Sequence, residues 1–200
     1  MNIINLVDDE GNVVSCIPKD NWDINFTGDG NKVILHKDLC INHLRMTLGN
    51  NMIIRVEKSI HKLENVFIGA LRSRGGGITI GKNFSCVDVQ FLLNEDALIS
   101  IGDDCMFSAA IKLWGSDGHS IIGMEDPYEI YNKSEGINIG NHVWICENAR
   151  ILKNSLISDN SVVANSALVC KKFYDGNVII GGNPANIIKR NINWTREAPK

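Results

Sequence analysis

The sequence predicts an all-β protein in which short parallel strands wind into a single-stranded β-helix, or solenoid. Three observations predict this fold: an aliphatic residue recurs at every sixth position, one four-residue phrase occurs three times, and the composition favours strands and turns, with 18 glycines and only 6% aromatic residues. A period of six matches neither the 3.6 of a helix nor the 2 of an alternating strand. It matches a prism in which each flat face takes one hexad.

The six-residue period is clearest between residues 139 and 169. The aliphatic positions are Ile139, Ile145, Ile151, Ile157, Val163 and Val169. Four residues after each of the first five comes a small or β-branched residue: Val143, Ala149, Ser155, Ser161 and Ala167. We expect the aliphatic side chains to point inward and the small ones to fill the tight corners between faces.

The repeated phrase is Ile-x-Ile-Gly, at residues 78–81, 99–102 and 137–140. Three hexads make one coil, but the steps from Ile80 to Ile101 and from Ile101 to Ile139 are longer than whole numbers of such coils. The surplus residues must leave the wall as loops. We expect the main loop at about 114–136, because this stretch is irregular and rich in glycine. Binding groups tend to lie on such loops.

The two ends of the chain are expected to differ from the solenoid at 31–182. Residues 1–30 are expected to form an edge cap, with 2–7 and 12–17 paired as a hairpin. At the other end, Asn183-Pro184-Ala185 has the pattern of an N-cap, a proline at the first helical position and a helix start. The sequence therefore predicts a short helix and tail over 183–200, with Trp194 packed nearby.

Composition excludes several classes of protein. A net charge of -3 without a basic stripe argues against a nucleic-acid partner. No apolar run approaches the roughly 18 residues of a membrane span, and the N-terminus lacks the features of a secretory signal. The six cysteines are scattered, without a C-x-x-C pair, so we expect reduced, mostly buried thiols in a cytoplasmic protein rather than disulfides or a metal site.

The repeats and two further motifs carry a family resemblance. The run 139–169, followed by Gly-Gly-Asn-Pro-Ala at 181–185, closely resembles the hexapeptide-repeat acyltransferases. The segment Ser-Asp-Gly-His-Ser-Ile at 116–121 resembles the catalytic loop of members that O-acetylate sugars and capsular polysaccharides, in particular sialic and polysialic acid. The resemblance covers residues 78–192 well and residues 1–77 only in general character.

This resemblance implies a left-handed β-helix, a homotrimer, an active site between subunits, acetyl-CoA as acyl donor and a carbohydrate acceptor. The sequence also departs from the family pattern. Cys146 follows Trp-Ile where glycine is usual, and Asn154, Ser158 and Ala164 stand where relatives often have glycine. We expect these departures to affect packing and turns rather than chemistry.

Acyl transfer from a thioester to an alcohol needs a base, donors for the oxyanion and a site that holds both substrates. His119, on the predicted loop, is the candidate general base. Asp117 is expected either to orient the imidazole ring or to cap the turn. Ser116 is a candidate substrate contact and not a covalent nucleophile, because the G-x-S-x-G pattern is absent.

Three aromatic residues are further candidates. Trp144 precedes an inward aliphatic residue, so its indole is expected to face outward, against the acceptor, the pantetheine arm or another subunit. We place it with His119 in the predicted catalytic site. Trp114, at the base of the loop, and His142, two residues before Trp144, are candidate substrate contacts.

The resemblance also places the CoA site along the C-terminal coils. By that resemblance, Lys171, Lys189 and Arg190 are expected to meet the phosphates. Ala164 and Gly182 are expected to allow close approach of the backbone to the cofactor. No metal ion is expected.

Three other functions compete with O-acetylation. The same scaffold serves N-acetyltransferases acting on amino sugars, including nucleotide-linked ones, which is the main alternative. A γ-type carbonic anhydrase would need three zinc-binding histidines, and only His119 and His142 lie in the regular region. A non-catalytic structural solenoid would leave the Ser-Asp-Gly-His loop without a role.

Overall fold

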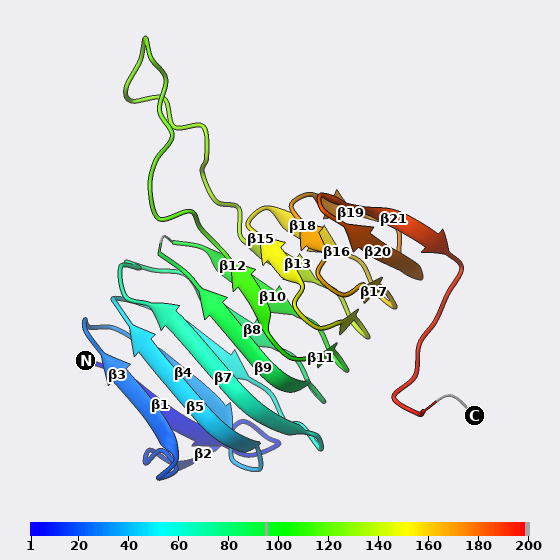
Figure 1. The fold of residues 1–200 in the computed structure, drawn as a ribbon. Coiled ribbons are helices and arrows are strands. Elements are labelled where there is room, and N and C mark those ends of the chain that lie inside the picture. Colours follow the sequence, from blue (N-terminus) through cyan, green and yellow to red (C-terminus); the bar gives the residue numbers. More distant parts are fainter. Residues whose placement is uncertain (95, 199–200) are drawn as a thin grey trace.

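The computed structural model describes residues 1–94 and 96–198, and it is a solenoid of parallel strands in two sheets (Figure 1). The nine-stranded sheet contains β1 (Ile3–Val7), β2 (Val13–Ser15), β4 (Lys32–His36), β6 (Ile53–Val56), β8 (Gly77–Ile80), β10 (Leu98–Ile101), β13 (Ile137–Ile139), β16 (Ser155–Ile157) and β19 (Lys172–Phe173). The twelve-stranded sheet contains β3 (Trp22–Phe26), β5 (Cys40–Leu48), β7 (Lys62–Ala70), β9 (Ser85–Leu92), β11 (Met106–Phe107), β12 (Ile111–Trp114), β14 (Trp144–Ile145), β15 (Arg150–Leu152), β17 (Val162–Val163), β18 (Leu168–Val169), β20 (Val178–Gly182) and β21 (Ala185–Arg190).

The repeated Ile-x-Ile phrase forms one ladder of the nine-stranded sheet. Strands β8, β10 and β13 pair in parallel, and the second isoleucines Ile80, Ile101 and Ile139 are direct register partners. All three are at most 2% exposed. The surplus residues between the phrases therefore leave the wall, as predicted, and the isoleucines stack along one core.

The hexad prediction is confirmed. The six aliphatic positions from Ile139 to Val169 are almost fully buried, and so are the five small residues that follow them. The corners between faces place Asn148, Asn154 and Asn160 at positive φ, near 60°. Asparagine tolerates this left-handed conformation, which explains why Asn154 can stand where relatives have glycine.

The early coils are longer than the late ones. The step along the chain from Arg45 to its register partner Phe67 is longer than the step from Arg150 to its partner Leu168. Strands β5 and β7 each have nine residues, where the later coils have strands of two or three. The larger coil explains why the six-residue pattern is weak before residue 78.

The N-terminal hairpin forms as predicted, with β1 and β2 antiparallel. However, β1 also pairs in parallel with β4, and β3 pairs in parallel with β5. The segment 1–30 is therefore the first coil of the solenoid as well as the cover of its edge.

The predicted C-terminal helix is wrong. Residues Ala185–Arg190 form strand β21, which pairs antiparallel with β20, and no helix occurs in the described residues. The N-cap pattern is local, whereas the last coil presents unpaired backbone groups at its open edge, and a strand satisfies them. A tail then turns back along the solenoid (Figure 1); the last two residues of the predicted 183–200 segment lie outside the described residues.

The cysteines are less buried than expected. All six are free, and Cys86 and Cys105 are buried, but Cys16, Cys40 and Cys170 are exposed. Nothing in residues 1–94 and 96–198 forms a helix of the length and apolar character that a membrane span requires.

Candidate active site

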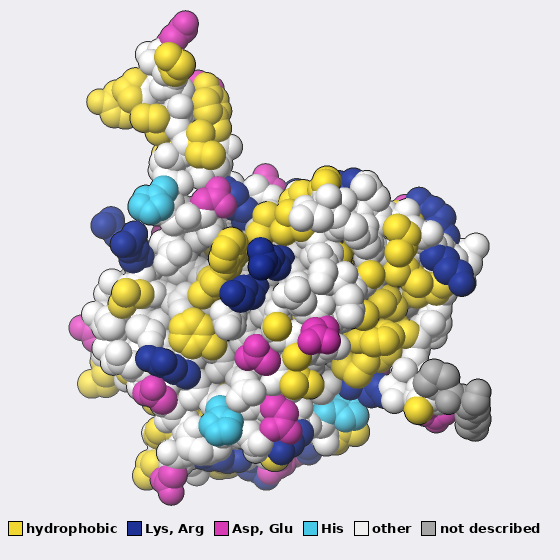
Figure 2. All heavy atoms as spheres, in the orientation of Figure 1, with side chains coloured by type: hydrophobic (Ala, Val, Ile, Leu, Met, Phe, Trp, Pro, Cys, Tyr) yellow, Lys and Arg dark blue, Asp and Glu magenta, His cyan; other side chains and the backbone are white. Residues whose placement is uncertain are grey.

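An arm formed by residues 115–136 projects from the solenoid between β12 and β13 (Figure 1). Its outer part is a narrow antiparallel hairpin: the Tyr131 amide donates to the Ile121 carbonyl, and Ile122 bridges to Ile130. Large apolar side chains on this hairpin are exposed, and hydrophobic atoms line both of its sides in Figure 2. The exposed members are Ile121, Ile122, Met124, Tyr128, Ile130 and Tyr131.

Three polar side chains fasten the base of the arm. The Asn132 amide nitrogen donates to the Asp117 carboxylate at 2.7 Å and to the His119 carbonyl at 2.8 Å. The Lys153 ammonium lies 2.6 Å from Asp117 Oδ2. Burial alone would raise the pKa of Asp117, but the hydrogen bonds from Lys153 and Asn132 and the charge of Lys153 lower it. Asn132 and Lys153 were not predicted, because no local motif marks them.

His119 is exposed at this fastened base. It lines a hollow of about 350 Å³ together with Gly118, Ser120, Ile130, Asn132 and Lys133. No described residue hydrogen-bonds or ion-pairs with its imidazole, and Asp117 is engaged by Lys153 and Asn132 instead. Of the two roles expected for Asp117, its contacts match the fastening of the turn.

A second hollow of about 450 Å³ shares Lys133 with the first. Its described lining carries three cations, Arg72, Arg74 and Lys133, against one carboxylate, Asp96. No described carboxylate forms an ion pair with either guanidinium group. An anion that enters this hollow would therefore meet cationic groups close to His119.

The two other candidates at the arm differ in exposure. Trp114, the last residue of β12, is 43% exposed on the outer face of the sheet. Ser116 is buried, and its hydroxyl accepts a hydrogen bond from the Asn94 amide at 2.7 Å. Ser116 thus joins the arm to the preceding coil.

Trp144 and His142 lie on a different part of the solenoid. Trp144 is half-buried on β14, and its indole N–H donates to Ser108 Oγ at 3.3 Å. The His142 ring stacks on Trp194 of the tail, with centroids 4.1 Å apart, and Trp194 in turn lies 6.0 Å from Trp144. None of the described hollows contains both His119 and Trp144.

Both nitrogens of His142 are engaged. Nδ1 lies 2.7 Å from Asp104 Oδ2, and Nε2 lies 3.1 Å from the Trp194 carbonyl oxygen. Both partners are hydrogen-bond acceptors, so both contacts are hydrogen bonds only when the ring carries two protons. The indole N–H of Trp194 donates back to the His142 carbonyl at 2.8 Å.

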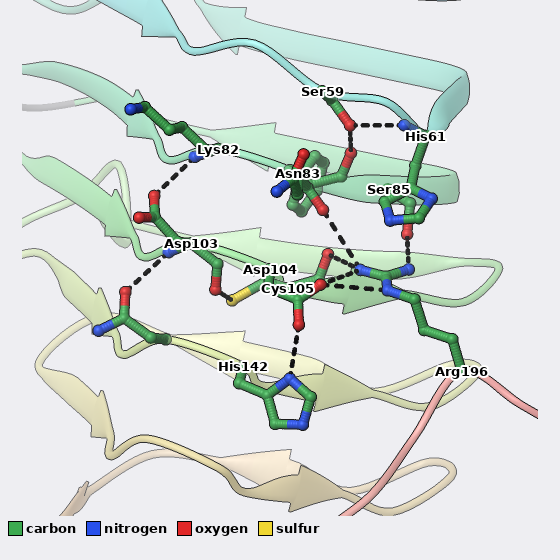
Figure 3. A network of polar contacts seen from close by, with 12 residues as sticks. Ser59, His61, Lys82, Asn83, Ser85, Asp103, Asp104, Cys105, His142 and Arg196 are labelled. Atoms are coloured by element: carbon green, nitrogen blue, oxygen red, sulfur yellow. Dashed lines mark hydrogen bonds and ion pairs between the residues drawn. The ribbon is translucent and has the colours of Figure 1, made fainter.

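Arg196 extends this network across the solenoid, as Figure 3 shows. Its guanidinium donates to Asp104 Oδ1 at 3.1 Å and to Ser85 Oγ at 2.7 Å, and it also reaches the Asn83 carbonyl. Burial alone would raise the pKa of Asp104, but hydrogen bonds from His142 and Arg196 and their charges lower it. The tail is therefore held on the solenoid by buried aromatic packing and a charged network.

The residues predicted to contact CoA gather at the C-terminal end of the solenoid. Lys171 follows β18 and donates to Asn186 of β21 at 2.6 Å. Arg190 pairs with Asp175 at 2.9 Å, and Lys189 is exposed. Ala164 follows β17, and its Cβ lies 3.2 Å from the position that a Cβ added at Gly181 would take. Gly182 has a φ of 100°.

One group in the described part of the chain has the spacing of a metal site. Ligand atoms of Asp9, His36 and Asp38 lie within 4.8 Å of one another. The Lys58 ammonium, however, lies 2.8 Å from Asp9 and 3.8 Å from Asp38. Lys58 therefore supplies the positive charge for these carboxylates.

Comparison with known proteins finds two relatives that carry the same name, although no family model matches the chain. It is 30% identical over 171 residues to the polysialic acid O-acetyltransferase of Neisseria meningitidis, covering 85% of this chain and 78% of that protein. It is 35% identical over 137 residues to the polysialic acid O-acetyltransferase of Escherichia coli O1:K1 / APEC. That match covers 68% of this chain but only 44% of the Escherichia coli protein.

Solved structures agree with these relatives. The crystal structure of the polySia-specific acetyltransferase NeuO matches with a TM-score of 0.66 and 25% identity, covering 91% of this chain and 85% of that one. The polysialic acid O-acetyltransferase OatWY shares the fold, with a TM-score of 0.55 and 24% identity over 99% of this chain and 89% of that one. The chain therefore belongs to the hexapeptide-repeat acyltransferases, which are left-handed β-helix proteins, and it is similar to members named polysialic acid O-acetyltransferases.

Proposed function

We propose that the chain transfers an acetyl group from acetyl-CoA to a hydroxyl of an acidic sugar, with His119 as general base. The observation that carries this proposal is the position of His119, whose free imidazole lines a hollow that shares Lys133 with a cationic hollow. The names of the relatives support it, because both act on a polymer of an acidic sugar.

In the proposed reaction, His119 accepts the proton of the acceptor hydroxyl as its oxygen attacks the thioester carbonyl carbon. The tetrahedral intermediate then expels the thiolate of CoA, which takes the proton from the imidazolium. No covalent bond to the enzyme forms, since the thioester is already activated. The cationic hollow holds the sugar carboxylate, so that one hydroxyl is presented to His119.

The active unit in this proposal is a homotrimer with carbohydrate and CoA bound between subunits. His119 and Trp144 line different parts of one chain, and the arm exposes apolar side chains that a neighbour would cover. We propose that the arm of one subunit reaches the wall of the next that carries Trp144. CoA then lies along the C-terminal coils, near Lys171, Lys189 and Arg190.

The function is tested by mixing the protein with acetyl-CoA and one acceptor at a time: polysialic acid, free sialic acid, a neutral glycan and an amino sugar. We expect release of the CoA thiol with the sialic acid acceptors and, by NMR, an acetyl ester on a sugar oxygen. An amide product would support the N-acetyltransferase instead. No thiol release with any acceptor would contradict both.

The role of the cationic hollow is tested by the double variant Arg72→Ala/Arg74→Ala. We expect its KM for the acidic acceptor to rise while kcat and the KM for acetyl-CoA stay near those of the wild type. The matched control is Lys32→Ala, which removes an exposed cation on β4 of the other sheet. An unchanged KM in the double variant would place the carboxylate elsewhere.

A further inference from the structure

A separate hollow of about 300 Å³ lies on the outer face of the first coils. It crosses β3, β5, β7 and β9, and its lining includes Asp23, His43, Arg45, Phe67 and Asp88. None of its lining residues belongs to the arm, to the cationic hollow or to the C-terminal coils. The acetyl-transfer site described above leaves it without a role.

The aromatic side chain of Phe67, which is half-buried on β7, lines this hollow. Phe67 points outward from β7, and Gly69 is the next residue on the same face. A Cβ added at Gly69 would lie 3.0 Å from Cε1 and 3.2 Å from Cζ of the Phe67 ring. A side chain at Gly69 would therefore press on the ring, so glycine leaves room for Phe67 to pack over this position. The Phe67 ring lies against Gly69 and also lines the hollow.

Hydrogen-bond donors and hydrogen-bond acceptors both lie around the Phe67 ring. Asp23, Arg45 and Phe67 are direct register partners on adjacent strands, and His43, Asn65 and Asp88 form the neighbouring row. Arg45 and Asp23 are each 70% exposed and lie 3.6 Å apart, a loose pair that leaves both groups accessible. The lining therefore offers donors and acceptors around one apolar surface, and it carries two carboxylates, Asp23 and Asp88, against one guanidinium, Arg45.

This combination matches the chemistry of a pyranose ring. Each sugar hydroxyl both donates and accepts hydrogen bonds, so mixed amide, carboxylate and guanidinium groups suit it. The C–H groups on one side of the ring form an apolar patch that packs against an aromatic face. A carboxylate alone would be held better by the cationic hollow beside His119.

We propose that the Phe67 hollow is a sugar-binding subsite that holds the acceptor glycan several residues away from the hydroxyl that is acetylated. This inference rests on the proposed function. The same outward row continues from Phe67 through Gln90 and Lys112 to Arg150. Adjacent strands are about 4.8 Å apart, so Lys112 lies two strands, or about 10 Å, from Phe67. The arm leaves the sheet from the end of the same strand as Lys112. A polymer could therefore span both places, and a single sugar could not.

The subsite is tested with Phe67→Leu, which keeps an apolar cover over Gly69 but removes the ring face. Binding of polysialic acid and of free sialic acid is measured by calorimetry without acetyl-CoA, and KM is measured for both acceptors. We expect about a three- to tenfold loss in polymer affinity, a matching rise in polymer KM, and no change for the monomer. Phe67→Trp should restore polymer binding. Ile53→Ala is the control, because Ile53 is 51% exposed on the other sheet.

Two outcomes would overturn the subsite: wild-type protein that does not bind the polymer, or Phe67→Leu protein that binds it as the wild type does. Failure of the proposed function gives a different result. In that case no acceptor is acetylated, while polymer binding measured by calorimetry still depends on Phe67.

Discussion

At the scale of single residues, the structure separates side chains that fasten the base of the arm from one, His119, whose ring is accessible. Asp117, Asn132 and Lys153 are engaged with one another, and Ser116 is tied to the preceding coil. His119 stands among them with its ring accessible. Such a division is what general-base catalysis needs, since the base must be positioned without being consumed by a structural contact.

The first prediction concerns His119. His119→Ala should lower kcat by about 10²–10⁴-fold, because an alcohol reacts poorly until its proton is accepted. CoA affinity and the unfolding temperature should stay near those of the wild type, since the His119 side chain forms no hydrogen bond or ion pair with a described residue. Steady-state kinetics and CoA titration measure both. If His119→Ala keeps more than about a tenth of the wild-type rate, another residue is the base.

The second prediction concerns the acid stability of the tail. Hydrogen bonds and charges from His142 and Arg196 hold the pKa of Asp104 below its ordinary value, despite the opposing effect of burial. A lowered pKa in the folded state means that Asp104 stabilises the fold above its unfolded pKa of about 3.9. That contribution is lost as the pH falls through the folded pKa.

We therefore expect Asp104→Asn to be less stable than the wild type at neutral pH, and the difference to shrink below about pH 4. Urea unfolding at a series of pH values measures it. Asp20→Asn is the control, because Asp20 is an exposed carboxylate that takes no part in this network. A difference that is the same at every pH would assign the effect to packing rather than to charge.

At the scale of elements, the sequence predicted the elements that repeat and missed the pairing of β21 with β20. The hexads, the stacked Ile-x-Ile phrases, the N-terminal hairpin and the projecting arm all follow from local patterns, and they are confirmed. Strand β21 was missed because Asn183-Pro184-Ala185 is a helix signal only if the following residues have no strand to join. The edge of β20 supplies that strand, and only the folded chain shows it.

The residues of the candidate site likewise divide into those that a local motif marks and those that no motif marks. His119 could be found because a motif surrounds it, whereas Asn132 and Lys153 come well after that motif in the chain and carry none of their own. The contact between His142 and Trp194 joins residues 52 positions apart. Contacts of this kind depend on how the coils stack, which the period alone does not give.

The third prediction concerns the C-terminal strands. Lys171→Ala and the double variant Lys189→Ala/Arg190→Ala should each weaken CoA binding by about tenfold, as removal of a charge-assisted phosphate contact typically does. Calorimetry with CoA and with dephospho-CoA measures the loss and identifies the residue that meets the 3′-phosphate. Lys19→Ala, at the opposite end of the solenoid, is the matched control. Unchanged CoA binding in both variants would place the cofactor elsewhere.

At the scale of the whole molecule, the arm and the walls suggest a shared site. One chain exposes six large apolar side chains on a hairpin that projects from the solenoid (Figure 1). A threefold assembly would give each arm a neighbouring wall to cover, and would bring His119 of one subunit toward Trp144 of the next. The arm would then contribute both to assembly and to catalysis.

The fourth prediction tests this assembly. Light scattering should give the mass of a trimer, and mixing His119→Ala with Trp144→Ala subunits should restore part of the activity that each variant lacks alone. Complementation requires that the two residues act in one site from different chains. A fully active monomer would contradict the shared site, and so would mixed trimers that remain inactive.

The tail changes how the solenoid can come apart. A stack of coils is nearly one-dimensional, because each coil touches only its neighbours, and it can fray from either end. Trp194 and Arg196 instead connect the end of the chain to residues 52 and 111 positions earlier, across several coils. The C-terminal coils cannot open one at a time without first releasing these contacts.

Hydrogen exchange would measure how strongly these contacts restrain the C-terminal coils. In the wild type, amides of β17 and β20 should exchange about as slowly as those of β8 and β10. In Trp194→Ala/Arg196→Ala they should exchange faster, whereas Glu197→Gln in the same tail should have no effect. Because contacts of the tail join the last coil to the middle of the solenoid, we expect unfolding to begin at the N-terminal coils.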